Sequence, residues 1–312
     1  MGNCNNTPNI ITRPFTGDDD FWRVRNLLID TYPIAPTGFN WEVRRWDGWR
    51  FYNADSTWNP DWVKQVCLWE TKNGMLVGAA HPEGIGDVHL EVHPDFRDIE
   101  QDMISWAENN LTSLLDNKQR RLKIFVFEYD QQRQLLLEQR GYVKMNSGGV
   151  LRKTKFNNKH RQHPNIAEGY TIRTVNAEDN DDCQKIADLL NAAFNRDFHT
   201  AAEFRNFAKL APCYRQDLDL VAVAPDGMFA AYTGVPFNEA NNYGIFEPVC
   251  THPEHLRKGL AHRLMLEGLC RLKALGASEV YVVTGDQIAA NKLYDSIGFE
   301  EVYKGYEWQK IF

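Results

Sequence analysis

The sequence predicts an α/β protein of the α+β type, with two domains in tandem, each a mixed and mostly antiparallel sheet flanked by helices. The chain has 312 residues, which is enough for two domains of roughly 100–200 residues each. Segments with strand and helix patterns follow one another in the same order in both halves. The polar segment 154–168 lies between the halves and has the composition of a linker. We therefore expect domains at 10–153 and 169–312, after a flexible N-terminus at 1–9.

In the first half, local signals mark where elements start and stop. Thr16 is expected to cap a helix, with Asp19 completing a capping box, and Pro33 ends that helix. Asn73 and Gly74 predict a tight turn between two strands. The strands expected here are 10–13, 66–69, 75–80, 88–92, 122–127 and a closing strand at 149–153, and the later helices are 103–115 and 131–139.

The second half repeats this order of elements. Thr200 and Glu203 form the pattern of a capping box at a helix start. The segment 225–227, Pro-Asp-Gly, predicts a turn between strands, and Asp286 is expected to cap a short helix. The expected strands are 170–174, 220–224, 228–234, 243–251, 280–283 and a last hairpin at 299–308, and the expected helices are 183–194, 200–211, 260–275 and 287–297.

Composition limits the class of protein. Apolar residues make up 43% and charged residues 25%, as in an ordinary soluble globular protein. A net charge of −7 argues against a nucleic-acid partner, and no apolar run is long enough for a membrane span. Six cysteines lie scattered without a Cys-x-x-Cys pair, so we expect reduced thiols in the cytoplasm and no metal site. Whether the protein is a monomer or a homodimer stays open.

Aromatic residues gather at 34–64, and eight of the nine tryptophans precede residue 107. Large rings are usually buried, so packing in the first core is the simpler interpretation. The alternative is a rim that stacks on a flat or cationic ligand.

Short matches between the halves indicate a duplication. Residues 92–95, Val-His-Pro-Asp, match residues 251–254, Thr-His-Pro-Glu, and Gly141 and Gly298 follow at nearly equal spacing. The copies differ where chemistry is expected. Glu100, Asp102 and Leu137 in the first copy stand at the places of Gly259, Ala261 and Tyr294 in the second. We therefore expect the first domain to be degenerate, with the fold kept and the chemistry lost.

The segment 247–261 has the pattern of a phosphate-binding junction. A strand ends there, a basic loop follows, and a helix begins. The first N–H groups of a helix have no partner within it, and the helix dipole adds partial positive charge. Gly259 lets a ligand approach the backbone, and Arg257 and Lys258 add full charges.

With these residues, the second half resembles the GNAT superfamily of acyl-CoA-dependent N-acyltransferases. The loop pattern Gln/Arg-x-x-Gly-x-Gly/Ala fits at Gly259 and Ala261, with Leu256 at the irregular first position. The downstream pattern Asn-x-x-Ala-x-x-Leu-Tyr-x-x-x-Gly-Phe fits residues 287–299 everywhere except at Gln287. The resemblance covers 170–312 well and the first half by pattern only. It implies two tandem GNAT-like domains, an arrangement similar to that of the mycothiol synthases, although no motif indicates their substrate.

The resemblance implies acetyl-CoA as cosubstrate and a set of residues that hold it. The strand before the loop would lie against the pantetheine arm, in a splay between that strand and 280–283. Pro248 supports this independently, because a proline in a central strand marks a break in pairing. The implied binding residues are Val249, Cys250, Thr251, Arg257, Lys258, Gly259, Leu260, Ala261, His262, Gln287 and Asn291.

Two residues are candidates for catalysis. Tyr294 would be the general acid, since a phenol stays protonated at neutral pH, and the alternative is a half-buried structural tyrosine. Glu247 would be the base, directly or through water, and the alternative is a structural carboxylate. His252 lies in a His-Pro turn and is interpreted as structural.

The predicted function is transfer of an acetyl group from acetyl-CoA to an amine of a small molecule, with one active site in the second domain. One alternative is aminoacyl transfer of the peptidoglycan-bridge type, but the enzymes of that type lack the glycine loop that Gly259 and Ala261 complete. Another is a non-catalytic acyl-CoA-binding sensor or interaction protein, which Tyr294 disfavours.

Overall fold

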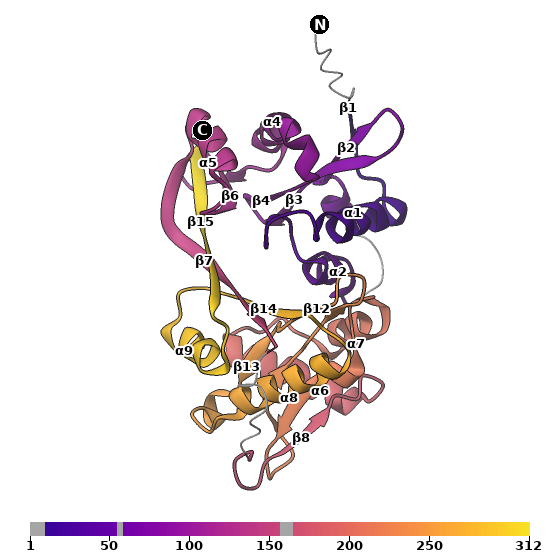
Figure 1. Cartoon of the computed structure of the whole chain (residues 1–312), viewed down its shortest axis with the longest axis vertical. Helices are drawn as coiled ribbons and strands as arrows, with labels where there is room; N and C mark the ends of the chain where they lie inside the picture. The colour runs from indigo at the N-terminus through magenta and orange to yellow at the C-terminus, as the bar shows by residue number, and fades with distance from the viewer. Residues whose placement is uncertain (1–9, 55–58, 157–164) are drawn as a thin grey trace, which may run out of the picture. The chain divides into compact units, whose positions relative to one another are not determined.

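The structure, a computed structural model, describes residues 10–54, 59–156 and 165–312 (Figure 1). The expected flexible N-terminus, residues 1–9, and residues 157–164 of the expected linker lie outside the described residues. None of the helices that the structure describes is long and apolar enough to cross a membrane.

Two compact units make up the chain, and neither is a continuous segment. The first unit consists of Met1–Glu42, Trp58–Gly148 and Lys304–Phe312, and the second of Val43–Thr57 and Gly149–Tyr303. Each half of the sequence therefore gives a segment to the unit that the other half mainly forms. These are units of packing, whereas the boundaries expected from the sequence are those of repeated domains. The expected domains thus stay a prediction.

The first unit is built on a mixed sheet. Its strands are β1 (Ile10–Pro14), β2 (Cys67–Thr71), β3 (Leu76–Gly84), β4 (Asp87–Val92), β5 (Ser113–Leu114), β6 (Arg120–Phe127) and part of β15 (Glu301–Ile311). Its helices are α1 (Asp18–Thr31), α3 (Pro60–Val63), η1 (Pro94–Ile99), α4 (Glu100–Asn110) and α5 (Gln131–Gln139). The strand order is β1-β2-β3-β4-β6-β15, with β5 beside β6, and all neighbours are antiparallel except β4 and β6.

Helices α1 and α4 both pack on β3. In α1 this follows from apolar spacing, since Phe21, Val24 and Leu28 recur on one helix face and are buried. The core cluster of the unit contains Met103 from α4 and also Trp308 from β15. The last strand of the chain is thus part of the first core.

The second unit contains a four-stranded antiparallel sheet in the order β13-β10-β9-β8 and a second group of strands around β14. The strands are the part of β7 (Val143–Lys155) from Gly149 onward, β8 (Thr171–Thr174), β9 (Leu220–Val223), β10 (Phe229–Thr233), β11 (Phe237–Asn238), β12 (Tyr243–Ile245), β13 (Val249–Thr251) and β14 (Glu279–Thr284). The helices are α2 (Val43–Phe51), α6 (Asn180–Phe194), α7 (Ala201–Leu210), η3 (Gln216–Leu218), η4 (Pro253–His255), α8 (Leu260–Ala274) and α9 (Ile288–Ile297). Strand β14 pairs in parallel with β12 and antiparallel with residues 150–155 of β7.

Two expectations about strand partners are wrong. Residues 299–308 form no hairpin, because β15 is one strand that pairs with β6 of the first unit. Residues 149–153 do not close the first sheet, because this part of β7 pairs with β14. Both errors have one cause: an apolar strand pattern shows that a strand exists, whereas its partner is set by pairing across long sequence distances.

The capping signals had mixed outcomes. The box of Thr200 and Glu203 is present, with both reciprocal hydrogen bonds. Thr16 caps nothing, since α1 begins at Asp18 and the Thr16 hydroxyl donates to Asp20 instead. Asp286 is also not a cap, because the N-cap of α9 is Gln287.

Candidate active site

The segment predicted as one strand at 243–251 is broken in two. Up to Phe246, whose N–H donates to Tyr281 O at 2.9 Å, the chain runs along β14. From Glu247 it turns to β10, with Glu247 N donating to Gly234 O at 2.9 Å. The break falls at Pro248, as expected from a proline in this strand, and the Glu247–Pro248 peptide bond is cis. Consequently β13 and the end of β14 belong to different sheets.

Strand β13 presents a free edge. Gly234 N donates to Pro248 O, and His252 N donates to Ala230 O. Hydrogen bonding alternates along an antiparallel pair, so the peptide groups of Val249 and Thr251 face away from β10. No strand in the described part of the chain pairs with this edge. An extended ligand can therefore form strand-like hydrogen bonds there.

Cys250 lies between these two residues and faces the other way. Its backbone is opposite Tyr232 of β10, and its side chain is buried in the apolar cluster beneath the sheet. Burial raises the pKa of the Cys250 thiol to about 12. The position thus offers neither free peptide groups nor a reactive thiolate.

The start of α8 is open to an anion. Gly259 occupies the N-cap with φ of 70°, no side chain caps the helix, and its first turn has no acidic residue. Arg263 N donates to Gly259 O, but no hydrogen bond from the described residues reaches the N–H groups of residues 260–262. A Cβ at Gly259 would have open space around it. These features fit a phosphate group, since uncapped N–H groups and the helix dipole both favour negative charge.

The side chains of the loop have different roles. Lys258 Nζ donates to the Tyr170 hydroxyl at 2.6 Å, so its charge is partly committed within the unit. Arg257 is exposed, and its φ of 62° lies in the left-handed region. Leu260 packs in the core, while Ala261 and His262 are half-buried, and burial lowers the pKa of His262.

Tyr294 lies buried on α9, against Phe299 at a ring distance of 6.0 Å. Val249 of β13 packs against the same apolar cluster. Burial raises the pKa of Tyr294 to about 12, although the nearby Arg152 charge acts in the opposite direction. Its hydroxyl has no hydrogen-bond partner among the described residues, so a protonated donor is available for a ligand.

The loop before α9 is held by the other two residues predicted to bind the cofactor. Asn291 Nδ2 donates to Gly285 O and to Gln287 O, both at 3.0 Å. No sequence motif pointed to Arg152 on β7, which donates to Asn291 O and to Asp295 Oδ1. Arg152 therefore fixes the helix that carries Tyr294.

Glu247 faces two arginines of α2, which sequence reasoning missed. Arg44 Nη1 lies 3.6 Å from Glu247 Oε1, and Arg45 Nε lies 3.8 Å from Oε2. Helix α2 packs against α7, where Tyr52 contacts Phe207 at a ring distance of 5.5 Å. This part of the aromatic segment therefore packs in the second unit, not in the first core. The only sequence signal was the adjacent Arg-Arg pair.

The corresponding place in the first unit is filled by its own side chains. Strands β4 and β6 pair at only two positions and then diverge. Arg133 donates to Leu90 O of β4 and to Glu100, the residue at the place of Gly259. Burial alone would raise the pKa of Glu100, but Arg133 and Arg97 together lower it.

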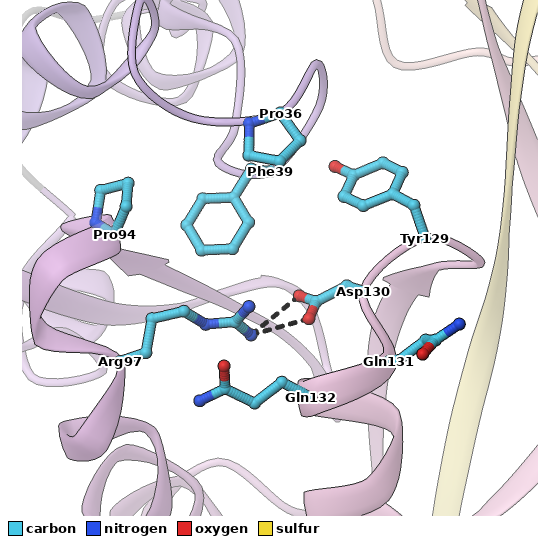
Figure 2. Close-up of a pocket in the computed structure, with 8 residues that line it drawn as sticks. All are labelled: Pro36, Phe39, Pro94, Arg97, Tyr129, Asp130, Gln131 and Gln132. Carbon is cyan, nitrogen blue, oxygen red and sulfur yellow. Dashed lines mark hydrogen bonds and ion pairs between the residues drawn. The ribbon is translucent and has the colours of Figure 1, made fainter.

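A hollow of about 300 Å³ adjoins this cluster (Figure 2). Arg97 and Asp130 both line this hollow, and Arg97 Nη2 donates to the two Asp130 carboxylate oxygens at 2.8 and 3.0 Å. The centroid of the Phe39 ring lies 4.9 Å from the Arg97 guanidinium. Its lining contains none of the predicted site residues, which all lie in the second unit.

Comparison with known families supports an acyltransferase. Residues 183–299 match the model of the acetyltransferase (GNAT) family. This segment contains β13, the loop to α8, and Tyr294. A search of curated protein sequences gave no match.

Solved structures share the fold over nearly the whole chain. A tandem GNAT protein from the clavulanic acid biosynthesis pathway has 17% identity and a TM-score of 0.66, covering 97% of this chain and 98% of that one. A GCN5-related N-acetyltransferase from Sphaerobacter thermophilus has 18% identity and a TM-score of 0.62, covering 97% and 95%. An acetyltransferase of the GNAT family from Colwellia psychrerythraea has 11% identity and a TM-score of 0.60, covering 97% and 99%. The predicted fold class of two tandem domains with mixed sheets is confirmed.

Proposed function

We propose that this protein is an acetyl-CoA-dependent N-acetyltransferase acting on a small-molecule amine, because residues 183–299 match the model of the acetyltransferase (GNAT) family, whose members transfer an acyl group from acyl-CoA. A single active site lies in the second unit. The observation that carries the proposal is the free edge of β13, which leads directly to the uncapped start of α8. The first unit has its own side chains at the corresponding place, which supports one site per chain.

The residues of this edge and helix start would hold the cosubstrate. Val249 and Thr251 would bond the pantetheine arm through their backbone, and the N–H groups of residues 260–262 would bind the pyrophosphate. Arg257 adds a charge in reach of the same loop. Cys250, Gln287 and Asn291 act indirectly, by keeping the strand and the loop before α9 in place. When bound, acetyl-CoA supplies the acetyl group as a thioester that an amine nitrogen can attack.

Glu247 and Tyr294 would move the protons. The Glu247 carboxylate accepts a proton from the acceptor nitrogen as the new C–N bond forms, directly or through a water. The Tyr294 hydroxyl gives its proton to the sulfur as the C–S bond breaks, which produces a neutral thiol. Arg44 and Arg45 place two positive charges beside the Glu247 carboxylate.

Thiol release from acetyl-CoA, measured with a panel of amines, tests the proposal. The panel contains aminoglycosides, polyamines, amino acids and peptides with free N-termini, and products are identified by mass. We expect release that depends on one class of amine and is abolished when that amine is acetylated beforehand. Binding of acetyl-CoA without release for any amine would support the non-catalytic sensor instead.

We place the enzyme in the cytoplasm, without nucleic acid, membrane or metal partners, as a monomer or homodimer. Among the described residues, cysteines 67, 183, 213, 250 and 270 form no disulfide, which suits a reducing compartment. The net charge of −7 disfavours binding to nucleic acid.

A further inference from the structure

The described part of the chain does not satisfy the hydrogen-bonding capacity of the Arg44 guanidinium. Its side chain is only 18% exposed and lies over the Phe207 ring, 5.5 Å from the centroid. Its Nε atom is buried without a hydrogen-bond partner. The contact with Glu247, at 3.6 Å, is an ion pair too long for a hydrogen bond, and the Arg44 side chain makes no hydrogen bond to the residues that the structure describes.

Such a group points to a missing acceptor. A guanidinium has five N–H donors in a planar fork, and leaving buried donors unpaired is costly. The fork matches a carboxylate, which it binds through two parallel hydrogen bonds. A ligand with a carboxylate would therefore complete the surroundings of Arg44.

The place of Arg44 separates this ligand from the pyrophosphate. Glu247 precedes β13, whereas the uncapped helix start at Gly259 follows it. At about 3.3 Å per residue, β13 spans about 7 Å from Val249 to Thr251, and the loop follows its far end. The anion at Arg44 is therefore on the acceptor's side of the site.

We infer that the acceptor is an amino acid or a close derivative, whose carboxylate Arg44 binds while its amine meets Glu247. This inference rests on the proposed function. Without a ligand, Arg44 and Glu247 form an ion pair with each other. In the complex, the amine of the acceptor takes the place of the Arg44 guanidinium beside Glu247, and the carboxylate of the acceptor takes the place of Glu247 beside Arg44. Arg45, at 3.8 Å from Glu247, keeps the second carboxylate oxygen paired.

Acceptors that differ only in the carboxylate test this inference. Each amino acid of a panel is compared with its amide, which keeps the amine and the side chain, and kcat/KM is measured for both. We expect the wild type to prefer the carboxylate form by about ten- to a hundredfold, mainly through KM. Arg44→Gln should remove this preference, and Arg44→Lys should keep part of it, because lysine has the charge without the fork.

Arg271→Gln is the matched control, since it removes an arginine from a half-exposed ion pair with Glu267 on α8. It should leave the preference unchanged. Equal or faster turnover of the amides by the wild type overturns the inference and leaves the proposed function intact. A preference that survives Arg44→Gln also overturns it.

Binding of product analogues gives a second readout that needs no turnover. N-acetylated amino acids and their amides are titrated calorimetrically into the protein in the presence of CoA. Tighter binding of the acids, lost in Arg44→Gln and kept in Arg271→Gln, supports the inference. Equal affinity within every pair contradicts it, whereas absence of turnover for all amines in the first assay contradicts the proposed function.

Discussion

At the scale of single residues, burial raises the pKa values of two acids in the second unit that have different surroundings, Tyr294 and Asp219. Burial raises the pKa of Tyr294 to about 12 and that of Asp219 to about 7. Their surroundings differ. Tyr294 has no hydrogen-bond partner among the described residues, whereas Asp219 accepts hydrogen bonds from Tyr232 at 2.7 Å and Tyr214 at 3.1 Å. An unbonded donor suits a catalytic role, and a bonded carboxyl suits a structural one.

Tyr294→Phe should lower kcat about a hundredfold, because the departing sulfur loses its proton donor. The KM for acetyl-CoA should hardly change, since the hydroxyl holds nothing in the free protein. Steady-state thiol release measures both. Tyr142→Phe is the control, because it removes a similarly buried hydroxyl from the first unit and should leave kcat unaltered. Unaltered turnover in Tyr294→Phe would remove this residue from the mechanism.

Asp219 should make the protein less stable as the pH rises from about 4 to about 8. In this range the folded state keeps a proton that the unfolded state, with a carboxyl pKa near about 4, has lost. The difference amounts to about 4 kcal/mol. Asp219→Asn, which is neutral at every pH, should flatten this part of the curve. Thermal unfolding across the pH range measures the effect.

The control for this prediction lies two residues away. The Arg215 side chain lowers the pKa of Asp217, which is half exposed. Asp217→Asn should therefore leave the loss of stability above pH 4 in place. An Asp219→Asn curve parallel to that of the wild type would show that Asp219 titrates normally.

Among the residues of the candidate site, those that belong to a local sequence pattern could be predicted. Those that contact the site from far away in the sequence were missed. The glycine of the loop and Tyr294 stand in a motif, so their spacing was readable. Arg44 and Arg152 act on residues more than 130 positions away. No repeating pattern in the nearby sequence identifies such residues, because their role depends on which helix or strand packs beside them.

At the scale of elements, the start of α8 combines two properties that usually conflict. A helix is more stable with acidic residues or a cap at its N-terminus, and α8 has neither. The same absence leaves the N–H groups and the dipole available for an anion. The helix thus lacks a local stabilisation that most helices have, and a bound phosphate would supply it.

Ala261→Glu should therefore change stability and binding in opposite directions. The new carboxylate in the first turn should stabilise the helix by about 0.3–1 kcal/mol. It should also repel the pyrophosphate, so that the affinity for acetyl-CoA falls about tenfold or more. Thermal unfolding and calorimetric titration measure the two effects separately.

Ala261→Gln, with similar size and no charge, is the matched control and should keep most of the affinity. If Ala261→Glu binds acetyl-CoA as well as Ala261→Gln does, the start of α8 does not hold the pyrophosphate. The position of the element was predictable here, since Leu264, Leu269 and Leu272 follow the loop at helical spacing. The missing cap was predictable too, because no Ser, Thr, Asp or Asn stands at Gly259.

At the scale of the whole molecule, the two units exchange segments that the sequence placed elsewhere. The final residues 304–312 belong to the first unit, and α2 belongs to the second. The repeat in the sequence predicted two similar folds, and this was confirmed. It could not predict the exchange, because each segment has an ordinary strand or helix pattern, and its partner is chosen by burial and pairing over the whole chain.

This exchange predicts that the second half cannot fold by itself. Residues 165–312 alone lack β7, so β14 loses its antiparallel partner at six positions from Glu279 to Thr284. They also lack α2, whose Trp46 is fully buried and stacks on Trp49 at 5.0 Å, and which covers Phe207. We expect this fragment to show no cooperative thermal unfolding and no thiol release from acetyl-CoA.

The matched control is the same chain cut at one peptide bond within residues 157–164, with both fragments produced together. It keeps every exchanged segment, so it should recover cooperative unfolding and most of the activity of the intact chain. Circular dichroism and thiol release compare the fragment, the pair and the intact protein. Cooperative unfolding of the fragment alone would mean that the second unit folds without α2 and β7. Acetyl transfer by that fragment at the intact rate would in addition exclude Arg44 and Arg45 from the acceptor site.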